Sequence, residues 1–195
     1  MTERKLYKVL DYDKPINGGS GTYYLPAKRK DGTWKPGKWM PAVEGELELC
    51  ENGYHLTDFD HLLDWIGPDI YEAEYKGGSV GDFEDGDFED GDDKIAVRQV
   101  RLVRRLETWN DRAAREFACW CVRNTPISKD RTVWDLLTDD RSRNAVVVAE
   151  KFARGEATEA ELAAAWDAAR DAAWDAARAA ARAAQLKHLH EILGE

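Results

Sequence analysis

The 195-residue chain has a formal net charge of −10, and 34% of its residues are charged against 43% hydrophobic. A chain of this length can bury one sizeable core, which predicts one domain or one domain with an appendage. The sequence has no apolar run of roughly 18 residues, the length that a membrane span needs, and no apolar signal region at its start. We therefore expect a soluble, cytoplasmic protein without a membrane segment.

The acidity is local. Residues 82–93 hold eight acidic residues and no basic one, whereas the flanking segments 1–44 and 94–107 are rich in Lys and Arg. A basic patch for an anion is therefore compatible with the low isoelectric point. The three cysteines, Cys50, Cys119 and Cys121, match no zinc or redox spacing, so we expect a reducing compartment and no metal or cofactor.

Near the N-terminus, residues 6–10 have the composition of a strand and residues 15–21 that of a glycine-rich turn. Residues 27–41, which we name the basic-aromatic segment, interleave cationic side chains with two tryptophans. Such a mixture suits a stacked, anionic ligand such as a nucleotide. A solvated loop docked through its tryptophans is the alternative. The side chains concerned are Lys28, Arg29, Trp34, Lys35, Lys38 and Trp39.

Residues 46–77 have the clearest sequence pattern in the chain, which predicts a strand, a turn, a helix and a second strand. Alternation at Leu47 and Leu49 indicates the first strand, and residues 51–53 supply turn chemistry. A capping box at Thr57 and Asp60 predicts a helix over 58–66. Residues 70–75 alternate again as a strand. The apolar stripe expected on the helix consists of Phe59, Leu62, Leu63 and Ile66.

The acidic segment repeats the sequence GDFED at residues 81–85 and 86–90. A calcium-binding EF-hand fails here, because Asp90 stands where glycine is needed and Ala96 where the bidentate Glu should be. Low hydrophobicity and like charges predict a disordered loop between two strands instead.

The basic segment 94–106 is β-branched and predicts a long strand with a bulge near Gln99, although a helix competes. Residues 108–195 predict helices only. Capping boxes at Thr108, Thr132 and Thr158 open three of them, and residues 143–154 form another. On the first of these helices we expect an apolar stripe of Ala113, Phe117, Trp120 and Cys121.

The last predicted helix, residues 159–193, is alanine-rich and repeats every four residues. Two adjacent columns of alanine give it a smooth face, and a long helix without large core residues gains little by folding alone. This face is therefore expected to pack on another helix, which predicts a homo-oligomer.

Together these elements predict an α+β protein. Residues 1–107 form a small antiparallel sheet with a packed helix, and residues 108–195 an all-helical half that ends in the long alanine-rich helix.

Residues 7–109, through KVLDYD, PGKWMPAVEGELELCENGYHL, IYEAE and RLETW, resemble a small uncharacterised domain carried by tailed phages and prophages. Similar proteins often have a second cysteine after Cys50, Gly53, Tyr54 and His55, where this chain has Thr57. Residues 139–166 resemble alanine-rich tails of bacterial and phage proteins. The resemblance implies a phage setting in a bacterial host, in which many small proteins act against host defence, but brings no established activity.

Catalysis has weak support in the sequence. His55 and His61 lie near acidic residues, so an acid-base or ADP-ribosyl-transfer site could be assembled, but no nucleophile, base and orienting group stand at a diagnostic spacing. The acidic residues are Glu51, Asp58, Glu72 and Glu74.

The sequence favours non-catalytic binding of a small anionic, nucleotide-like ligand. The alternative is a protein-binding inhibitor of a host factor that uses the acidic segment or the alanine-rich helix. The overall acidity disfavours duplex nucleic acid. The side chains expected to bind the ligand are Lys28, Arg29, Trp34, Lys35, Lys38, Trp39, His55, Arg98 and Arg101, with Tyr23 or Tyr24 as a further candidate to stack on a base.

Overall fold

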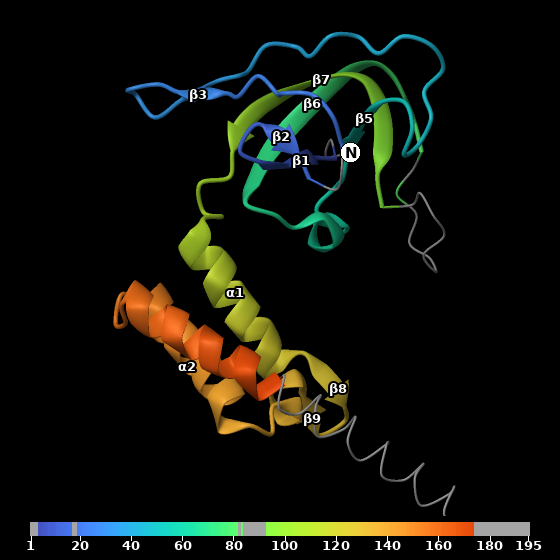
Figure 1. Cartoon of the computed structure of the whole chain (residues 1–195). Coiled ribbons are helices and arrows are strands. Elements are labelled where there is room, and N and C mark those ends of the chain that lie inside the picture. Colours follow the sequence, from blue (N-terminus) through green and yellow to red (C-terminus); the bar gives the residue numbers. More distant parts are fainter. Residues whose placement is uncertain (1–3, 17–18, 82, 84–92, 174–195) are drawn as a thin grey trace, which may run out of the picture. The chain divides into compact units, whose positions relative to one another are not determined.

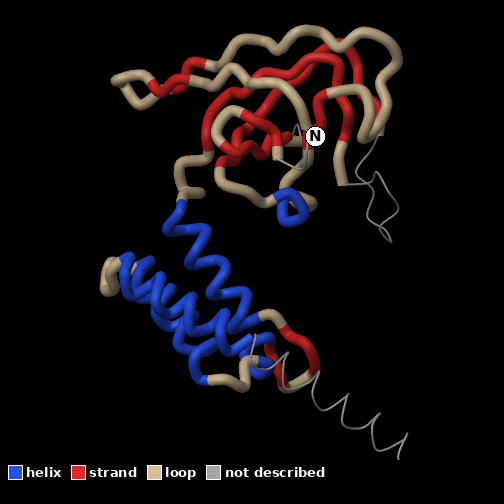
Figure 2. The backbone as a smooth tube through the Cα atoms, viewed as in Figure 1, coloured by secondary structure: helices blue, strands red, loops and turns tan. Residues whose placement is uncertain are grey.

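A computed structural model describes residues 4–16, 19–81, 83 and 93–173 of the chain (Figure 1). It divides into two compact units, Met1–Asn110 and Asp111–Glu195. The first holds a curled antiparallel sheet and the second is mainly helical, so the predicted α+β class is confirmed (Figure 2). Most of the acidic segment and residues 174–193 of the predicted alanine-rich helix lie outside the described residues.

Five antiparallel strands form the main sheet, in the order β2-β1-β6-β7-β5. The predicted strands at 6–10, 70–75 and 94–106 are confirmed, and the helix that competed for the last segment is wrong. The strands are β1 (Leu6–Asp11), β2 (Lys14–Pro15), β5 (Tyr54–Leu56), β6 (Asp69–Val80) and β7 (Ile95–Arg105).

The sheet curls until its two sides meet. Just after β5, the Thr57 amide donates to the Tyr7 carbonyl at 3.0 Å and its own carbonyl accepts from the Tyr7 amide at 2.7 Å. This pair of bonds joins β5 back to β1 around an apolar interior. The side chains buried there follow strand alternation except between Val97 and Val100, where the register of β6 and β7 shifts. They include Leu6, Leu10, Leu56, Tyr71, Val97, Val100 and Leu102.

The predicted bulge near Gln99 has its extra residue in β6, the partner strand. Lys76 pairs with Gln99 and Ser79 with Val97, so Gly77 and Gly78 face one residue of β7. Both glycines have a positive φ, of 83° and 95°, which other residues rarely adopt. A glycine pair therefore accommodates the mismatch that the alternation of β7 shows in the sequence.

The segment 46–66 departs from prediction. No strand forms at Leu47 or Leu49. A single bridge between Glu48 and Asn52 closes the predicted turn, and the strand, β5, follows that turn. Thr57 caps no helix, because its backbone pairs with Tyr7 and its hydroxyl donates to the Asp93 carbonyl at 2.8 Å.

The predicted helix over 58–66 is replaced by a single 3-10 turn, η1 (Leu62–Trp65). His61 is the N-cap residue of this turn and no side chain caps it, while Asp58 Oδ1 accepts the His61 amide at 3.1 Å just before the turn begins. Of the expected stripe, Leu62 is buried, whereas Phe59 and Leu63 are 71% and 61% exposed. A segment that ends at Gly67-Pro68 is too short to repay the cost of nucleating an α-helix.

The basic-aromatic segment contains a short hairpin of β3 (Ala27–Lys28) and β4 (Trp34–Lys35). Beyond it, residues 37–43, which we name the strap, lie along β7. The amides of Gly37, Met40 and Val43 donate to carbonyls of β7 at 2.9, 2.9 and 3.0 Å. The strap therefore satisfies part of a strand edge that would otherwise be unpaired.

The second unit is not all-helical. Pro126 cannot continue the preceding helix, and a small hairpin of β8 (Pro126–Ser128) and β9 (Arg131–Thr132) forms instead. The helices are α1 (Asp111–Asn124), the 3-10 helix η2 (Val133–Leu136), α2 (Asp140–Ala153) and a further helix whose described part covers 159–173.

Two of the predicted helix starts have the expected capping bonds. The Thr158 amide donates to the Glu161 carboxylate at 2.8 Å, and the Thr132 amide donates to Asp135 at 2.7 Å. On α1, Cys119 is buried and Trp120 is 58% exposed, so the expected position of Trp120 in the apolar stripe is wrong. The other members of the predicted stripe, Ala113, Phe117 and Cys121, are half-buried.

Candidate functional site

A pocket of about 590 Å³ opens in the first unit. Its wall includes residues of β1, β2 and β5, of η1 and of the loops between them. Those that carry its chemistry are Lys8, Tyr23, Glu51, His55, Trp65 and Lys94. The pocket therefore combines two ammonium groups, a carboxylate, an imidazole and aromatic rings.

Lys8 is the unusual member of this set. It lies between Leu6 and Leu10 on β1, and side chains at alternate strand positions share a face, so Lys8 occupies the core face of the curled sheet. Its Nζ donates to the His55 carbonyl oxygen at 3.0 Å and stands 5.4 Å from the centroid of the Tyr23 ring. Within the described part of the chain, no carboxylate forms an ion pair with it. Burial lowers the pKa of Lys8 to about 8.

His55 lies on β5, and its ring is held by the turn before that strand. Nε2 accepts a hydrogen bond from the Cys50 amide at 2.9 Å, so the neutral ring carries its proton on Nδ1. Burial, followed by the charges of Lys8 and Lys94, lowers the pKa of His55. At neutral pH the positive charge in the pocket therefore resides on the two lysines.

Trp65 and Lys94, which both line the pocket, are joined through the Asp93 carboxylate. The Asp93 carboxylate accepts from the Trp65 indole at 2.8 Å and from Lys94 at 3.0 Å. The Lys94 ammonium also lies 5.1 Å from the centroid of the Trp65 ring. Burial acts to lower the pKa of Lys94, but the hydrogen bond and charge of Asp93 raise it. Lys94 is therefore a cation held in place by its ion pair with Asp93.

Two tyrosines form an aromatic part of the lining. Tyr23 is 4% exposed and meets Tyr54 edge to face, with ring centroids 6.0 Å apart and planes at 75°. Burial, and then the neighbouring Tyr54, raise the pKa of Tyr23. The Tyr54 hydroxyl donates to the Pro41 carbonyl at 2.9 Å, which links the pocket to the strap.

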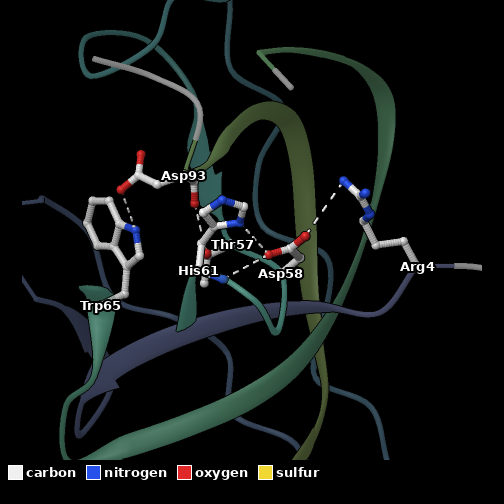
Figure 3. A network of polar contacts seen from close by, with 6 residues as sticks. All are labelled: Arg4, Thr57, Asp58, His61, Trp65 and Asp93. Carbon is white, nitrogen blue, oxygen red and sulfur yellow. Dashed lines mark hydrogen bonds and ion pairs between the residues drawn. The ribbon is translucent and has the colours of Figure 1, made fainter. Parts of the chain in front are cut away.

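A polar network begins at the Trp65 side of the pocket (Figure 3). Asp58 is 3% exposed and accepts from Nδ1 of His61 at 2.8 Å, while Arg4 lies 3.6 Å from its other oxygen. Figure 3 shows the Asp58 carboxylate between the His61 ring and Arg4. The network fixes the turn that carries Trp65, since Asp58 and His61 hold the chain just before η1.

Of the predicted ligand-binding residues, the structure brings only His55 and the stacking candidate Tyr23 into the lining of this pocket. Arg98 instead donates to the carbonyls of Val43 and Gly45, at 2.7 and 3.0 Å. Arg101 pairs with Glu74 and lies 4.8 Å from the centroid of the Trp39 ring.

The remaining predicted residues are dispersed over the surface. Lys28 pairs with Glu107 at 2.6 Å, and Lys38 lies 5.9 Å from the centroid of the Tyr24 ring. Arg29 and Lys35 are exposed, and Trp34 is half-buried in β4.

The acid-base candidates fall into three places. His55 and Glu51 line the pocket, and His61 pairs with Asp58. Glu72 and Glu74 pair with Arg104 and Arg101 on the neighbouring strand β7. The described residues contain no group of three or more side chains suited to holding a metal ion.

Sequence reasoning missed Lys8, Trp65 and Lys94, and it named Tyr23 only as one of two tyrosines that could stack on a base. A signal for Lys8 was present, because the run from Leu6 to Leu10 is otherwise apolar and a cation inside such a strand departs from the usual pattern. No comparable signal marks Trp65, whose position depends on loops that the fold brings together.

Comparisons with family models, with curated proteins and with solved structures found no match for this chain. The resemblance of residues 7–109 to a phage domain therefore stays a prediction. None of the helices that the structure describes is both long and apolar enough to cross a membrane.

Proposed function

We propose that the first unit binds a small anionic ligand in the Lys8 pocket. The observation that carries this proposal is a lysine on the core face of a sheet, beside a pocket of about 590 Å³, with no carboxylate partner among the described residues. Placing a cation there costs free energy unless something compensates its charge. A bound anion would supply that compensation.

The neighbours of Lys8 support a ligand that also has a planar ring. Trp65, Tyr23 and Tyr54 line the same pocket and offer aromatic surface, while Lys94 adds a second, fixed ammonium group. A charge-assisted hydrogen bond from Lys8 to a phosphate or carboxylate contributes about 1.5 to 3 kcal/mol. This combination favours a nucleotide-like compound over a simple inorganic anion.

Calorimetric titration of the full chain against a panel of cyclic and linear nucleotides tests the proposal. Lys8→Met keeps the length of the side chain but removes its charge, and should weaken binding by at least about tenfold. The matched control is the double variant Lys35→Glu, Lys38→Glu, which reverses exposed charges outside the pocket. We expect this control to change affinity by less than about threefold at physiological salt.

Two results would overturn the proposal. The first is that the wild type binds none of the compounds. The second is that the exposed double variant loses binding while Lys8→Met retains it, which would move the site to the basic-aromatic segment.

A further inference from the structure

We infer that Lys8 is a nucleophilic amine, able to capture an aldehyde in the pocket as an imine. This inference extends beyond reversible anion binding, since it concerns a covalent bond to Lys8 and does not require an anionic ligand. It depends on the position of Nζ and on the groups around it.

The geometry leaves the amine accessible to a small carbonyl compound. Lys8 is half-buried and lines the pocket, and its one described hydrogen bond is donated to the His55 carbonyl oxygen. A neutral amine that donates there keeps its lone pair for another partner. The aromatic surface of Tyr23 and Trp65 offers an apolar wall for the rest of the molecule.

The groups around Lys8 favour its neutral form. Tyr71 lies directly across on β6, Tyr23 approaches from the loop after β2, and His55 lies on β5. Two further charged groups line the pocket. Lys94 has its charge compensated by Asp93, and Glu51 forms no ion pair with Lys8 among the described contacts. Desolvation is the cause that lowers the pKa of Lys8 to about 8, in agreement with this arrangement.

The reaction needs no oxidant, reductant or metal. The Nζ lone pair adds to the carbonyl carbon, the carbonyl oxygen takes up a proton, and the nitrogen loses one, giving a carbinolamine. Loss of the hydroxyl group and of the remaining Nζ proton as water then gives a C=N bond. The balance is one amine and one aldehyde for one imine and one water.

The expected selectivity follows from the fraction of neutral amine. At pH 7 an amine with a pKa of about 8 is roughly 10% neutral, against roughly 0.03% for an exposed lysine. A less basic amine is also intrinsically less nucleophilic, which offsets part of this difference. We therefore expect Lys8 to react at least about tenfold faster than Lys35 or Lys38, both exposed.

Reductive trapping on the full chain tests the inference. The protein is incubated at pH 7 with benzaldehyde, or with a carboxybenzaldehyde of similar size, and borohydride then converts any imine to a stable secondary amine. Peptide mapping by mass spectrometry gives the labelled fraction of each lysine. Lys8 should be labelled first, and its labelling rate should rise with pH to a plateau above about 8.

Lys8→Arg keeps a positive charge but removes the nucleophile, because a guanidinium stays protonated. It should abolish the fast labelling, whereas the matched variant Lys35→Arg should leave it unchanged. Mapping within the wild type keeps the test valid if Lys8→Arg folds poorly. Uniform labelling of the lysines, or slower labelling at Lys8, overturns the inference.

The two aldehydes separate this inference from the proposed function. Fast labelling of Lys8 by both compounds at equal rates supports the imine and gives no support to an anion site. Fast labelling by the carboxybenzaldehyde alone supports both. Slow labelling by both compounds, with nucleotide binding intact in calorimetry, leaves the anion site standing and removes the nucleophile.

Discussion

Two regions of the first unit, the basic-aromatic segment and the pocket, contain lysines beside aromatic rings. They differ in which groups lie next to the lysine charge. In the basic-aromatic segment and its surroundings, Lys28 pairs with Glu107, and Trp39 lies between Lys76 and Arg101, with their charged groups 4.4 and 4.8 Å from its centroid. In the pocket, Lys8 has a carbonyl and a tyrosine ring for neighbours.

This difference shows that the number of cationic residues in a segment is a poor indicator of a ligand-binding site. A cluster of cations on a loop is readily solvated or paired, and each exposed contact contributes little. A single cation on the core face of a strand lowers the stability of the folded chain, because its charge is taken out of water. Such exceptions to the usual pattern concentrate at functional sites. The following variants test whether the two regions differ in this way.

The largest expected effect is on the strap. Trp39→Ala removes a half-buried ring and its two cation contacts, and should lower the free energy of unfolding by about 2 kcal/mol in urea titrations. Trp34→Ala is the matched control, with a smaller expected loss. If Trp39→Ala abolishes nucleotide binding and leaves stability unchanged, then the basic-aromatic segment is the binding region after all.

Arg98 gives the next test, because the sequence assigns it to the ligand while the structure places it on two strap carbonyls. Arg98→Met should cost about 1 to 1.5 kcal/mol of stability and accelerate hydrogen exchange at the Val43 amide, which donates to the Arg98 carbonyl. Nucleotide affinity of the folded protein should be unchanged. The exposed Arg29→Met serves as the control, and an equal loss there would refute a specific role for Arg98.

The parts of the fold that sequence predicted well are those governed by alternation. The strands at 70–75 and 94–106 alternate with a period of two, and each has a buried face in the structure. The strand at 6–10 was predicted from its apolar composition instead, and it is buried on both faces. The prediction of a helix over 58–66 was wrong because the residue expected to cap it makes a different contact. Thr57 was already committed to pairing with Tyr7, a contact about fifty residues away that local pattern cannot reveal.

The candidate site was predictable to a smaller extent. Lys8 is the one charged residue in the apolar run from Leu6 to Leu10, so its position alone marks it. Trp65 and Lys94 gave no such mark, and Tyr23 could not be told from Tyr24, because these residues converge from separate loops only in the folded chain. The unusual position of Lys8 could therefore be predicted from the sequence, whereas the residues that surround it in the pocket could not.

The pocket itself is tested by the pH dependence of stability. The pKa of Lys8 is about 8 in the folded chain and 10.5 as its ordinary value, so between these pH values the unfolded state binds more protons. Stability should therefore rise with pH through this window, and the destabilisation is fully present below pH 8. Lys8→Met should raise the free energy of unfolding at pH 7 by about 1 kcal/mol and remove the rise.

Buried tyrosines limit the range in which this measurement is clear. Burial raises the pKa of Tyr23 and Tyr71, which acts to lower stability as pH rises above about 10, where their unfolded counterparts ionise. The comparison of wild type with Lys8→Met cancels this contribution, because both chains contain the tyrosines. Parallel stability curves between pH 8 and 10 would show that Lys8 is not desolvated, and the contrast between the two regions would disappear.

The smallest expected effect is at the ion pair of Lys28 and Glu107. Its side chains are 45% and 52% exposed, so water screens their attraction although Nζ lies 2.6 Å from the carboxylate. A double-mutant cycle with Lys28→Met and Glu107→Gln should give a coupling energy of about 0.3 kcal/mol, falling toward zero in 1 M salt. A coupling above about 1 kcal/mol that persists in salt would mean that this pair helps to hold the hairpin of β3 and β4. The basic-aromatic segment would then contain a lysine, Lys28, that is held as firmly as Lys8. The presence of a charged partner alone could then not distinguish a structural lysine from one that binds a ligand.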